Sequence, residues 1–252
     1  MSGPATATSE VIWHDVECGS YEADLPLWRE LSSGSRRRSV LELGCGTGRV
    51  ALALARSGLR VAGIDNHPAL VAELNRRAAE CGLDATAAEG DIRKPGDGRG
   101  DRDLVLAPMQ LIQLLDGARE RALALVRMHD ELAPGGLAAI ALVEGDPTAS
   151  DHVAPGPPLP DVAERDGWIY SSLPLDSEVY GGAIRVRRLR QTVSPDGVLT
   201  DEVNVIRLAI TSANEIEREA ERVGLSAVGR RDVPVTDAHV GSTVVLLEKS
   251  PR

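Results

Sequence analysis

The feature that most constrains this chain is a glycine-rich turn that joins a short apolar run to a helical pattern. Residues 40–48 read VLELGCGTG, which places three glycines among the five residues after Leu43. An alanine-rich pattern with Val50 and Leu54 on one face follows directly. In an open α/β sheet, such a turn lets a ligand approach the backbone at the N-terminus of the next helix. We therefore expect a ligand at the carboxyl end of this strand.

Apolar runs alternate with helical patterns from this turn onward. The expected strands are 40–43, 60–65, 85–89, 103–107 and 137–143, and the expected helices are 50–56, 67–81 and about 116–132. Asp116 is expected to cap the last of these helices, and Gly82 to end the one before it. The order predicts a doubly wound α/β sheet, and 252 residues are enough to bury its core as one large domain.

A different pattern follows the fifth strand. Seven charged residues and five prolines between positions 144 and 167 predict an ordered loop or a flexible lid. The β-prone runs 183–193 and 198–208 are joined by a strong turn signal and predict a hairpin. The alternation of the first run changes phase near Arg187, which predicts a bulge there.

The closing segment returns to the pattern of the sheet. Ser212 and Glu215 have the spacing of a capping box, which predicts the start of a helix that ends at Gly224. Two further strands are expected at 226–232 and 242–248.

The charge balance excludes several classes of partner. Thirty-eight acidic and 28 basic residues give a formal net charge of −10, which repels nucleic acid and anionic membranes. Cys18, Cys45 and Cys81 lie far apart without metal-ligand spacing, so we expect reduced thiols and no metal. The first residues have no leader pattern and no apolar run could span a bilayer. We therefore expect a cytoplasmic protein with no nucleic acid or membrane partner.

Two acidic residues are expected at the same rim as the glycine turn. Asp65 ends the second strand 21 positions after Gly44, where a carboxylate can accept hydrogen bonds from ribose hydroxyls. Asp91 follows the third strand. Arg49 stands where a dinucleotide motif has its third glycine, which disfavours a pyrophosphate ligand. Each feature also has a purely structural interpretation: glycines for close packing, Asp65 as a helix cap and Asp91 as a turn residue.

At these residues the chain resembles the class I S-adenosylmethionine-dependent methyltransferases. The matching stretches are VLELGCGTG (40–48), GID (63–65), EGDI (89–92), DLVLAP (103–108) and LAPGGL (132–137). The resemblance implies a Rossmann-like, seven-stranded, mostly parallel sheet with a β-hairpin insertion before the last helix, as in small-molecule methyltransferases. It also implies four parts: an N-terminal helical cap (1–38), a cofactor-binding core (39–143), a loop and hairpin insertion that covers the acceptor (144–211), and a closing helix with the last two strands (212–252).

The resemblance implies a set of residues around S-adenosylmethionine. They are Glu42, Gly44, Cys45, Gly46 and Gly48 for the methionine part, Asp65 with Asn66 for the ribose, Asp91 and the Ile92 N–H for the adenine, the Ala107 carbonyl for the ammonium group, and Tyr21 as a further contact. The family's D/N-P-P-Y/F signature is absent at Pro108-Met109-Gln110, so nothing identifies an adenine or glutamine acceptor.

The acceptor side is predicted from aromatic and polar residues near the same rim. The six aromatic residues fall in two segments that we expect to shape the acceptor pocket, with Trp28 assigned instead to the edge of the core: Trp13, Tyr21, Trp28, Trp168, Tyr170 and Tyr180. His239, Tyr21 and Gln110 are the catalytic candidates, and His239 is the candidate base. His14 is a second histidine within reach of the rim, and Gln113 and Glu144 are candidates for binding the acceptor.

These observations favour methyl transfer from S-adenosylmethionine to N, O or C of a small-molecule metabolite. Three alternatives stay open: use of the sulfonium for cyclisation or aminocarboxypropyl transfer, a non-catalytic module that binds the cofactor, and a dinucleotide oxidoreductase. The expected partner is a small-molecule acceptor, and a homodimer is left open.

Overall fold

The computed structural model describes residues 6–34, 39–96, 98–144, 159–236 and 239–251. Its centre is a seven-stranded sheet in the order β10-β11-β5-β4-β1-β2-β3. The strands are β1 (Ser39–Leu43), β2 (Arg60–Asp65), β3 (Ala85–Glu89), β4 (Arg102–Ala107), β5 (Leu132–Leu142), β10 (Leu225–Val233) and β11 (Ser242–Lys249). The first five pair in parallel, and β11 and β10 add antiparallel strands beside β5. The doubly wound, mostly parallel sheet is therefore confirmed.

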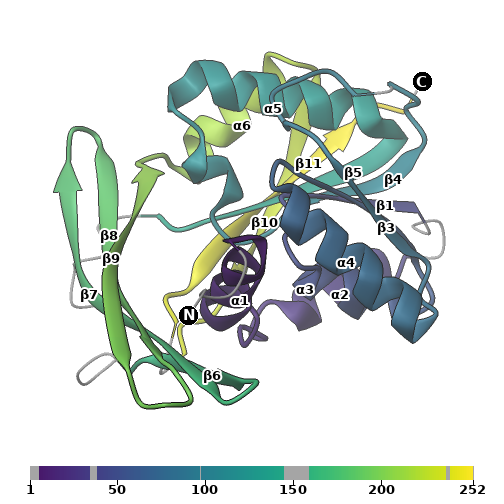
Figure 1. Ribbon diagram of the computed structural model, residues 1–252. Coiled ribbons are helices and arrows are strands. Elements are labelled where there is room, and N and C mark those ends of the chain that lie inside the picture. The colour runs from purple at the N-terminus through teal and green to yellow at the C-terminus, as the bar shows by residue number, and fades with distance from the viewer. Residues whose placement is uncertain (1–5, 35–38, 97, 145–158, 237–238, 252) are drawn as a thin grey trace.

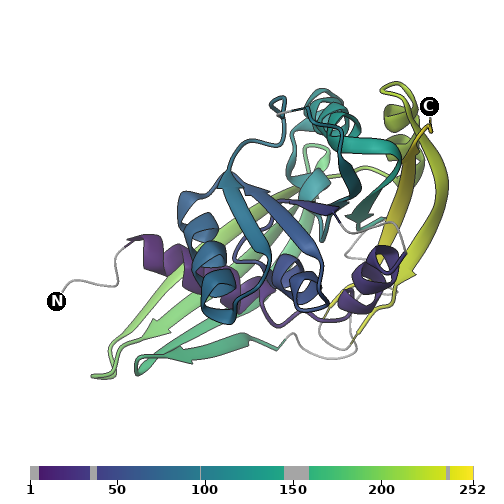
Figure 2. The same ribbon diagram turned by 90° about the vertical axis from the view of Figure 1, so that its right-hand side faces the viewer.

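Helices cover both faces of this sheet (Figures 1 and 2). The helices are α2 (Leu25–Ser32), α3 (Arg49–Ala55) and α4 (Pro68–Cys81) on one face, and α5 (Gly117–Glu131) and α6 (Ala213–Glu221) on the other. Trp28 of α2 is fully buried against the first face, as expected for a residue that seals the edge of the core. Met128 of α5 and Ile216 of α6 are fully buried against the second. Burial of two apolar clusters leaves the carboxyl ends of β1, β2 and β4 as the rim on which a site can form.

The insertion is larger than the predicted hairpin. It is a four-stranded antiparallel sheet of β6 (Asp161–Arg165), β7 (Trp168–Tyr180), β8 (Ala183–Val193) and β9 (Leu199–Ala209). The hairpin β8–β9 was predicted correctly, but β6 and β7 were missed. The expected bulge lies in the pairing of β7 with β8, where the register shifts between Pro174 and Asp176, opposite Arg188 and Arg187. The extra residue, Leu175, belongs to the partner strand β7. Residues 145–158, most of the predicted loop or lid, lie outside the described residues.

Helix α1 (Thr6–Cys18) lies between the insertion sheet and the central sheet, as both views show. Ile12, Trp13 and Val16 pack against Tyr170 of β7 in a small cluster separate from the two main cores. The Trp13 and Tyr170 rings meet edge to face with centroids 5.6 Å apart. Thus the expected N-terminal cap contacts the insertion as well as the core.

Local signals were confirmed in most places but not at every helix end. Ser212 and Glu215 form the predicted capping box of α6, and Gly82 ends α4 with a left-handed φ of 63°. Asp116 makes no side-chain cap on α5, so that prediction was wrong. Its carboxylate pairs with Arg207 of β9, an ion pair between distant segments that competes with the local cap. None of the described helices is long and apolar enough to cross a membrane.

Candidate functional site

The glycine-rich bend connects the end of β1 to the start of α3. Gly44, Gly46 and Gly48 all have positive φ values, of 63°, 52° and 95°. Left-handed backbone of this kind disfavours residues with a Cβ, so the three glycines are a conformational requirement of the bend. The N–H groups of Gly44 and Cys45 donate to the Ile64 carbonyl at 2.7 and 3.1 Å, which ties the bend to the end of β2.

Protein side chains occupy the directions in which side chains at the glycines would point. A Cβ on Gly44 would overlap the Leu111 side chain, and one on Gly46 would overlap the His14 imidazole. A Cβ on Gly48 would come within 2.9 Å of Leu52. The packing interpretation of the glycines is therefore correct for this side of the bend. A ligand would therefore meet the bend from another side, and the N–H groups of Gly44, Cys45, Gly46 and Gly48 already donate to acceptors within the protein.

Asp65 joins the bend to the start of α4. One carboxylate oxygen accepts from the Gly46 N–H at 2.8 Å, and the other accepts from the His67 N–H at 3.0 Å. The structural interpretation of Asp65 as a residue at the helix start thus holds as well. Each oxygen of an ionised carboxylate has about two acceptor positions, so both oxygens keep one for a hydroxyl donor. Asn66, the neighbouring cofactor candidate, is exposed at the same rim.

Glu42 is a buried carboxyl group beneath the bend. It accepts a hydrogen bond from the Ala51 N–H near the start of α3, while its Oε2 has no hydrogen-bond partner. Burial raises the pKa of Glu42 to about 8, although the nearby Arg49 guanidinium opposes the shift. Arg49 itself forms a buried ion pair with Asp24 at 2.8 Å. An unsatisfied buried oxygen beside a helix N-terminus is a position that a cationic ligand group can satisfy.

The predicted adenine residues follow β3. Arg93 holds both oxygens of the Asp91 carboxylate, with distances of 2.9 and 2.8 Å, and lowers its pKa to about 2. Asp91 is therefore ionised and already paired in this structure, while Ile92 is buried in the core. At the end of β4, Ala107 is fully buried and Met109 has a left-handed φ of 55°. Strain at a non-glycine residue is concentrated at functional sites, which agrees with a role for this strand end.

A hydrogen-bonded chain that the sequence did not reveal links α1 to the bend. The Thr47 hydroxyl donates to Asp15 at 2.8 Å, and the His14 Nδ1 lies 3.1 Å from the same hydroxyl oxygen. Asp15 also accepts from Arg77 of α4 at 3.0 Å. Burial lowers the pKa of His14. The sequence placed His14 near the rim, but it offered no signal for its contact with Thr47, 33 residues away.

The structure brings together two of the catalytic candidates, Tyr21 and His239. Their rings meet edge to face with centroids 4.8 Å apart, and the Arg49 guanidinium lies over the Tyr21 ring at 5.0 Å. Tyr21 is buried, and burial raises its pKa to about 12, so its hydroxyl stays protonated. Gln110, the third catalytic candidate, lies at the rim before the short helix η1 (Leu111–Leu114).

Two of the expected acceptor residues have structural hydrogen bonds instead. The Gln113 amide is buried and binds the backbone of Val143 in both directions, at 2.8 and 3.1 Å, and also the Ala209 carbonyl. Glu144 accepts from the Ala213 N–H at 2.7 Å, which stabilises the start of α6. These two side chains connect the end of β5 to the insertion and to the last helix. The Gln113 amide is fully used by these bonds, whereas the role of Glu144 in binding an acceptor stays a prediction.

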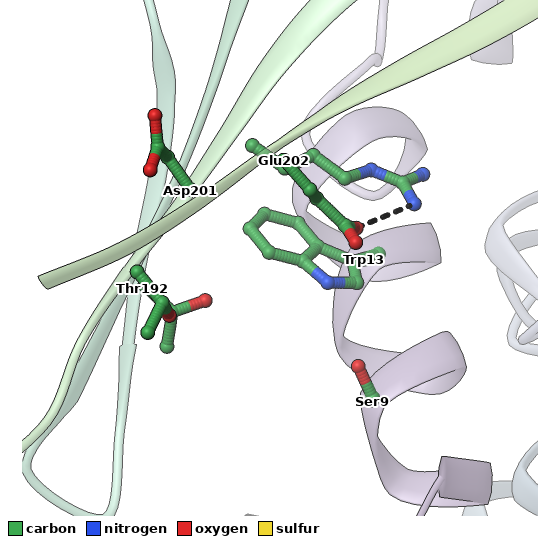
Figure 3. A pocket seen from close by; sticks show the side chains of 7 residues that line it. Ser9, Trp13, Thr192, Asp201 and Glu202 are labelled. Atoms are coloured by element: carbon green, nitrogen blue, oxygen red, sulfur yellow. Dashed lines mark ion pairs between the residues drawn. The ribbon is translucent and has the colours of Figure 1, made fainter.

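A shallow hollow of about 200 Å³ lies between α1 and the insertion sheet. Figure 3 shows Ser9 and Trp13 on the helix side and Thr192, Asp201 and Glu202 on the strands. The Arg190 guanidinium lies 5.1 Å from the Trp13 ring centre and 3.8 Å from Glu202. The hollow is on the Trp13 side of α1, whereas His14 contacts the bend. Among the described residues, no cluster of three or more His, Cys, Asp or Glu has the arrangement of a metal site.

The residues at the rim fit an S-adenosylmethionine cofactor. The bend presents backbone at a helix N-terminus, Asp65 has acceptor positions for ribose hydroxyls, and Glu42 has an unpartnered buried oxygen for a cationic group. Glu42 and the bend belong to one stretch of the sequence and Asp65 ends the neighbouring strand β2, and the three features meet at the same rim of the sheet.

Comparisons with known proteins agree with this fit. Residues 40–136 match a family model described as a methyltransferase domain. The fold is similar over nearly the whole chain to the sugar N-methyltransferase KedS8 from Streptoalloteichus sp. ATCC 53650, with a TM-score of 0.77, 20% identity, and coverage of 99% of this chain and 96% of that one. It is also similar to CalS10, an amino pentose methyltransferase from Micromonospora echinaspora solved with S-adenosylmethionine bound, with a TM-score of 0.70, 17% identity, and coverage of 99% and 100%.

A curated relative shows similarity over a shorter stretch. It is an S-adenosyl-L-methionine-dependent Diels-Alderase from Talaromyces variabilis, 44% identical over 62 residues. The match covers 25% of this chain and spans only 20% of that relative's length. The shared element is therefore a short segment, and this chain spans about a fifth of that relative's length.

Proposed function

We propose that this chain, a class I S-adenosylmethionine-dependent methyltransferase by its family match over residues 40–136 and by its fold, methylates the amino nitrogen of a small molecule, with amino sugars as the substrate class. The observation that carries the proposal is the extent of the fold similarity. The similarity includes α1 and the four-stranded insertion as well as the core. The structure of a sugar N-methyltransferase and that of an amino pentose methyltransferase each align with 99% of this chain.

The described residues support cofactor binding in a consistent way. When bound, S-adenosylmethionine supplies the methyl group as a strongly electrophilic sulfonium. Asp65 would hold the ribose hydroxyls, and Glu42 with the backbone of the bend would hold the amino-acid part. The main task of the remaining residues is then to orient the acceptor and exclude water.

The position of α1 and the insertion supports a covered acceptor site. Glu17 of α1 accepts from Arg190 of β8 at 2.7 Å and from the Ser172 hydroxyl of β7 at 2.8 Å. Trp13 adds an apolar contact to the same sheet. These contacts hold the helix and the insertion together, and His14 of the same helix contacts the bend.

A panel assay tests the proposal. The enzyme would be incubated with S-adenosylmethionine and free amino hexoses or amino pentoses, with the corresponding sugars that carry only hydroxyl groups as matched controls. We expect the amino sugars alone to gain one methyl group in the mass spectrum. Methylation of the hydroxyl-only sugars at an equal rate would contradict nitrogen as the acceptor atom.

The Diels-Alderase relative favours a second candidate, in which the cofactor is bound but no methyl group leaves it. Calorimetry separates binding from transfer. Tight binding of S-adenosylmethionine without any S-adenosylhomocysteine formed across the panel would support this alternative.

A further inference from the structure

The hydrogen-bonded chain at the bend determines which nitrogen of His14 carries the proton. Thr47 has one hydroxyl hydrogen and donates it to the Asp15 carboxylate at 2.8 Å, since an ionised carboxylate cannot donate. The contact of 3.1 Å between His14 Nδ1 and the Thr47 oxygen must then be donated by the imidazole. A neutral ring has only one N–H, so its proton is on Nδ1 and Nε2 keeps a lone pair.

This lone pair faces the glycine bend. The Nε2 atom is the part of the His14 ring that a Cβ on Gly46 would overlap most severely. The bend is also the point at which Asp65 and the start of α3 meet. His14 therefore places a basic nitrogen against the Gly46 backbone at the rim, in an orientation fixed by the contacts with Thr47 and Asp15.

We propose that His14 Nε2 accepts the proton that the acceptor amine must lose, and that Thr47 and Asp15 are positioning residues for this step. The proposal rests on the proposed function, because it requires an amine acceptor. An N–H bond of the ammonium group breaks, its electron pair stays on nitrogen, and the proton binds His14 Nε2. That electron pair then forms the N–CH₃ bond while the S–CH₃ pair returns to sulfur.

The electrostatic surroundings of His14 favour the neutral imidazole, which is the form that can accept a proton. Burial lowers its pKa; Asp15 of α1 and Asp65 of β2 oppose the shift, while Arg77 of α4 and Arg49 of α3 reinforce it. His14 is therefore neutral near pH 7, and the two carboxylates stabilise the imidazolium that forms. Burial disfavours the imidazolium, so the two carboxylates offset part of the cost of moving the positive charge from the ammonium group to the imidazole.

The NMR test is independent of activity. We expect the ¹⁵N shifts of His14 to show the Nδ1–H tautomer in the full-length protein near pH 7. In Thr47→Val the hydroxyl is lost, and we expect a mixture of the two tautomers. A wild-type His14 protonated on Nε2 would overturn the proposal, whatever the enzyme methylates.

The kinetic test compares His14→Gln with His129→Gln, a histidine on α5 away from the bend. With S-adenosylmethionine and an amino sugar, we expect His14→Gln to lower kcat about 10²-fold near pH 7. The loss should shrink as the pH rises, because solvent then supplies the neutral amine. The affinity for S-adenosylhomocysteine should change less than threefold, and His129→Gln should behave like the wild type.

The outcomes separate the two proposals. A wild type that binds no S-adenosylhomocysteine defeats the proposed function itself. A wild type that methylates amino sugars, with His14→Gln equally active at every pH, defeats only the assignment of His14. Should His14→Gln fail to fold, Thr47→Val serves in its place, with a smaller loss of kcat expected and an unchanged rate counting against the positioning role.

Discussion

Replacing Gly46 by alanine would test why the bend requires a residue without a side chain at this position. Gly46 has a φ of 52°, and an alanine held there costs about 1 kcal/mol of stability. The new methyl group would also overlap the His14 ring and force it away from Thr47, which loses a hydrogen bond worth about 1 kcal/mol. We therefore expect Gly46→Ala to lower the free energy of unfolding by about 2 kcal/mol.

Gly82 provides the matched control. Its φ of 63° is close to that of Gly46, but no atom lies within 4 Å of the position of an added Cβ. Gly82→Ala should therefore show the backbone cost alone, about 1 kcal/mol. Both variants can be measured by urea unfolding followed by circular dichroism, with the slope of the transition checked for constancy.

A second background isolates the contact with His14. In His14→Ala the ring is absent, so adding Gly46→Ala should cost only about as much as Gly82→Ala. The expected coupling between positions 14 and 46 is about 1 kcal/mol. The reasoning would be refuted if Gly46→Ala cost the same with and without the His14 ring, because the bend would then be empty on this side in solution.

Three further predictions concern charged groups. Arg121 and Glu219 form a buried pair at 2.6 Å between α5 and α6, so either single change to methionine should cost about 3–5 kcal/mol in urea unfolding, and the double change far less than the sum. Asp65→Ala should weaken S-adenosylhomocysteine binding in calorimetry by ~1–3 kcal/mol, with exposed Asp84→Ala unchanged. Burial raises the pKa of Glu42 from 4.5 to about 8, so the folded state keeps a proton that the unfolded state releases. This contribution to stability is complete below about pH 4.5 and is lost as the pH rises to 8. Between these values the free energy of unfolding of the wild type should fall by about 1.4 kcal/mol per pH unit relative to that of Glu42→Gln. Parallel curves of unfolding free energy against pH for the two proteins would contradict this prediction.

The core sheet was predictable because its signals are local. Strand β2 and strand β3 have the predicted bounds, and β1 and β4 begin one residue earlier than expected. A buried parallel strand is a continuous apolar run, and the turns between strand and helix carry their own glycine and proline signals. Neither kind of signal depends on what the segment contacts later.

The insertion was only half predictable because its strands contain residues that usually interrupt a sheet. Strand β7 carries Pro174 next to its bulge, and β6 carries the adjacent charges of Glu164 and Arg165. Pairing of β7 with β8 along eleven residues, and of β6 with β7, overrides these local preferences. The failed cap at Asp116 has the same cause, because Arg207 of β9 takes the carboxylate away from the helix end.

The location of the site was predictable from the sequence, but the roles of the individual residues within it were not. A glycine pattern shows where the backbone cannot carry side chains, and it does not show whether a ligand or another part of the protein approaches. At Gly46 the approaching group is His14, from a helix 32 residues earlier in the chain. Because the ring fills the side-chain direction and the N–H groups of Gly44, Cys45 and Gly46 already have acceptors within the protein, Asp65 is the group at this bend with acceptor positions left for a cofactor. The same ring contacts the bend at Gly46, and so places a basic nitrogen beside the proposed cofactor site.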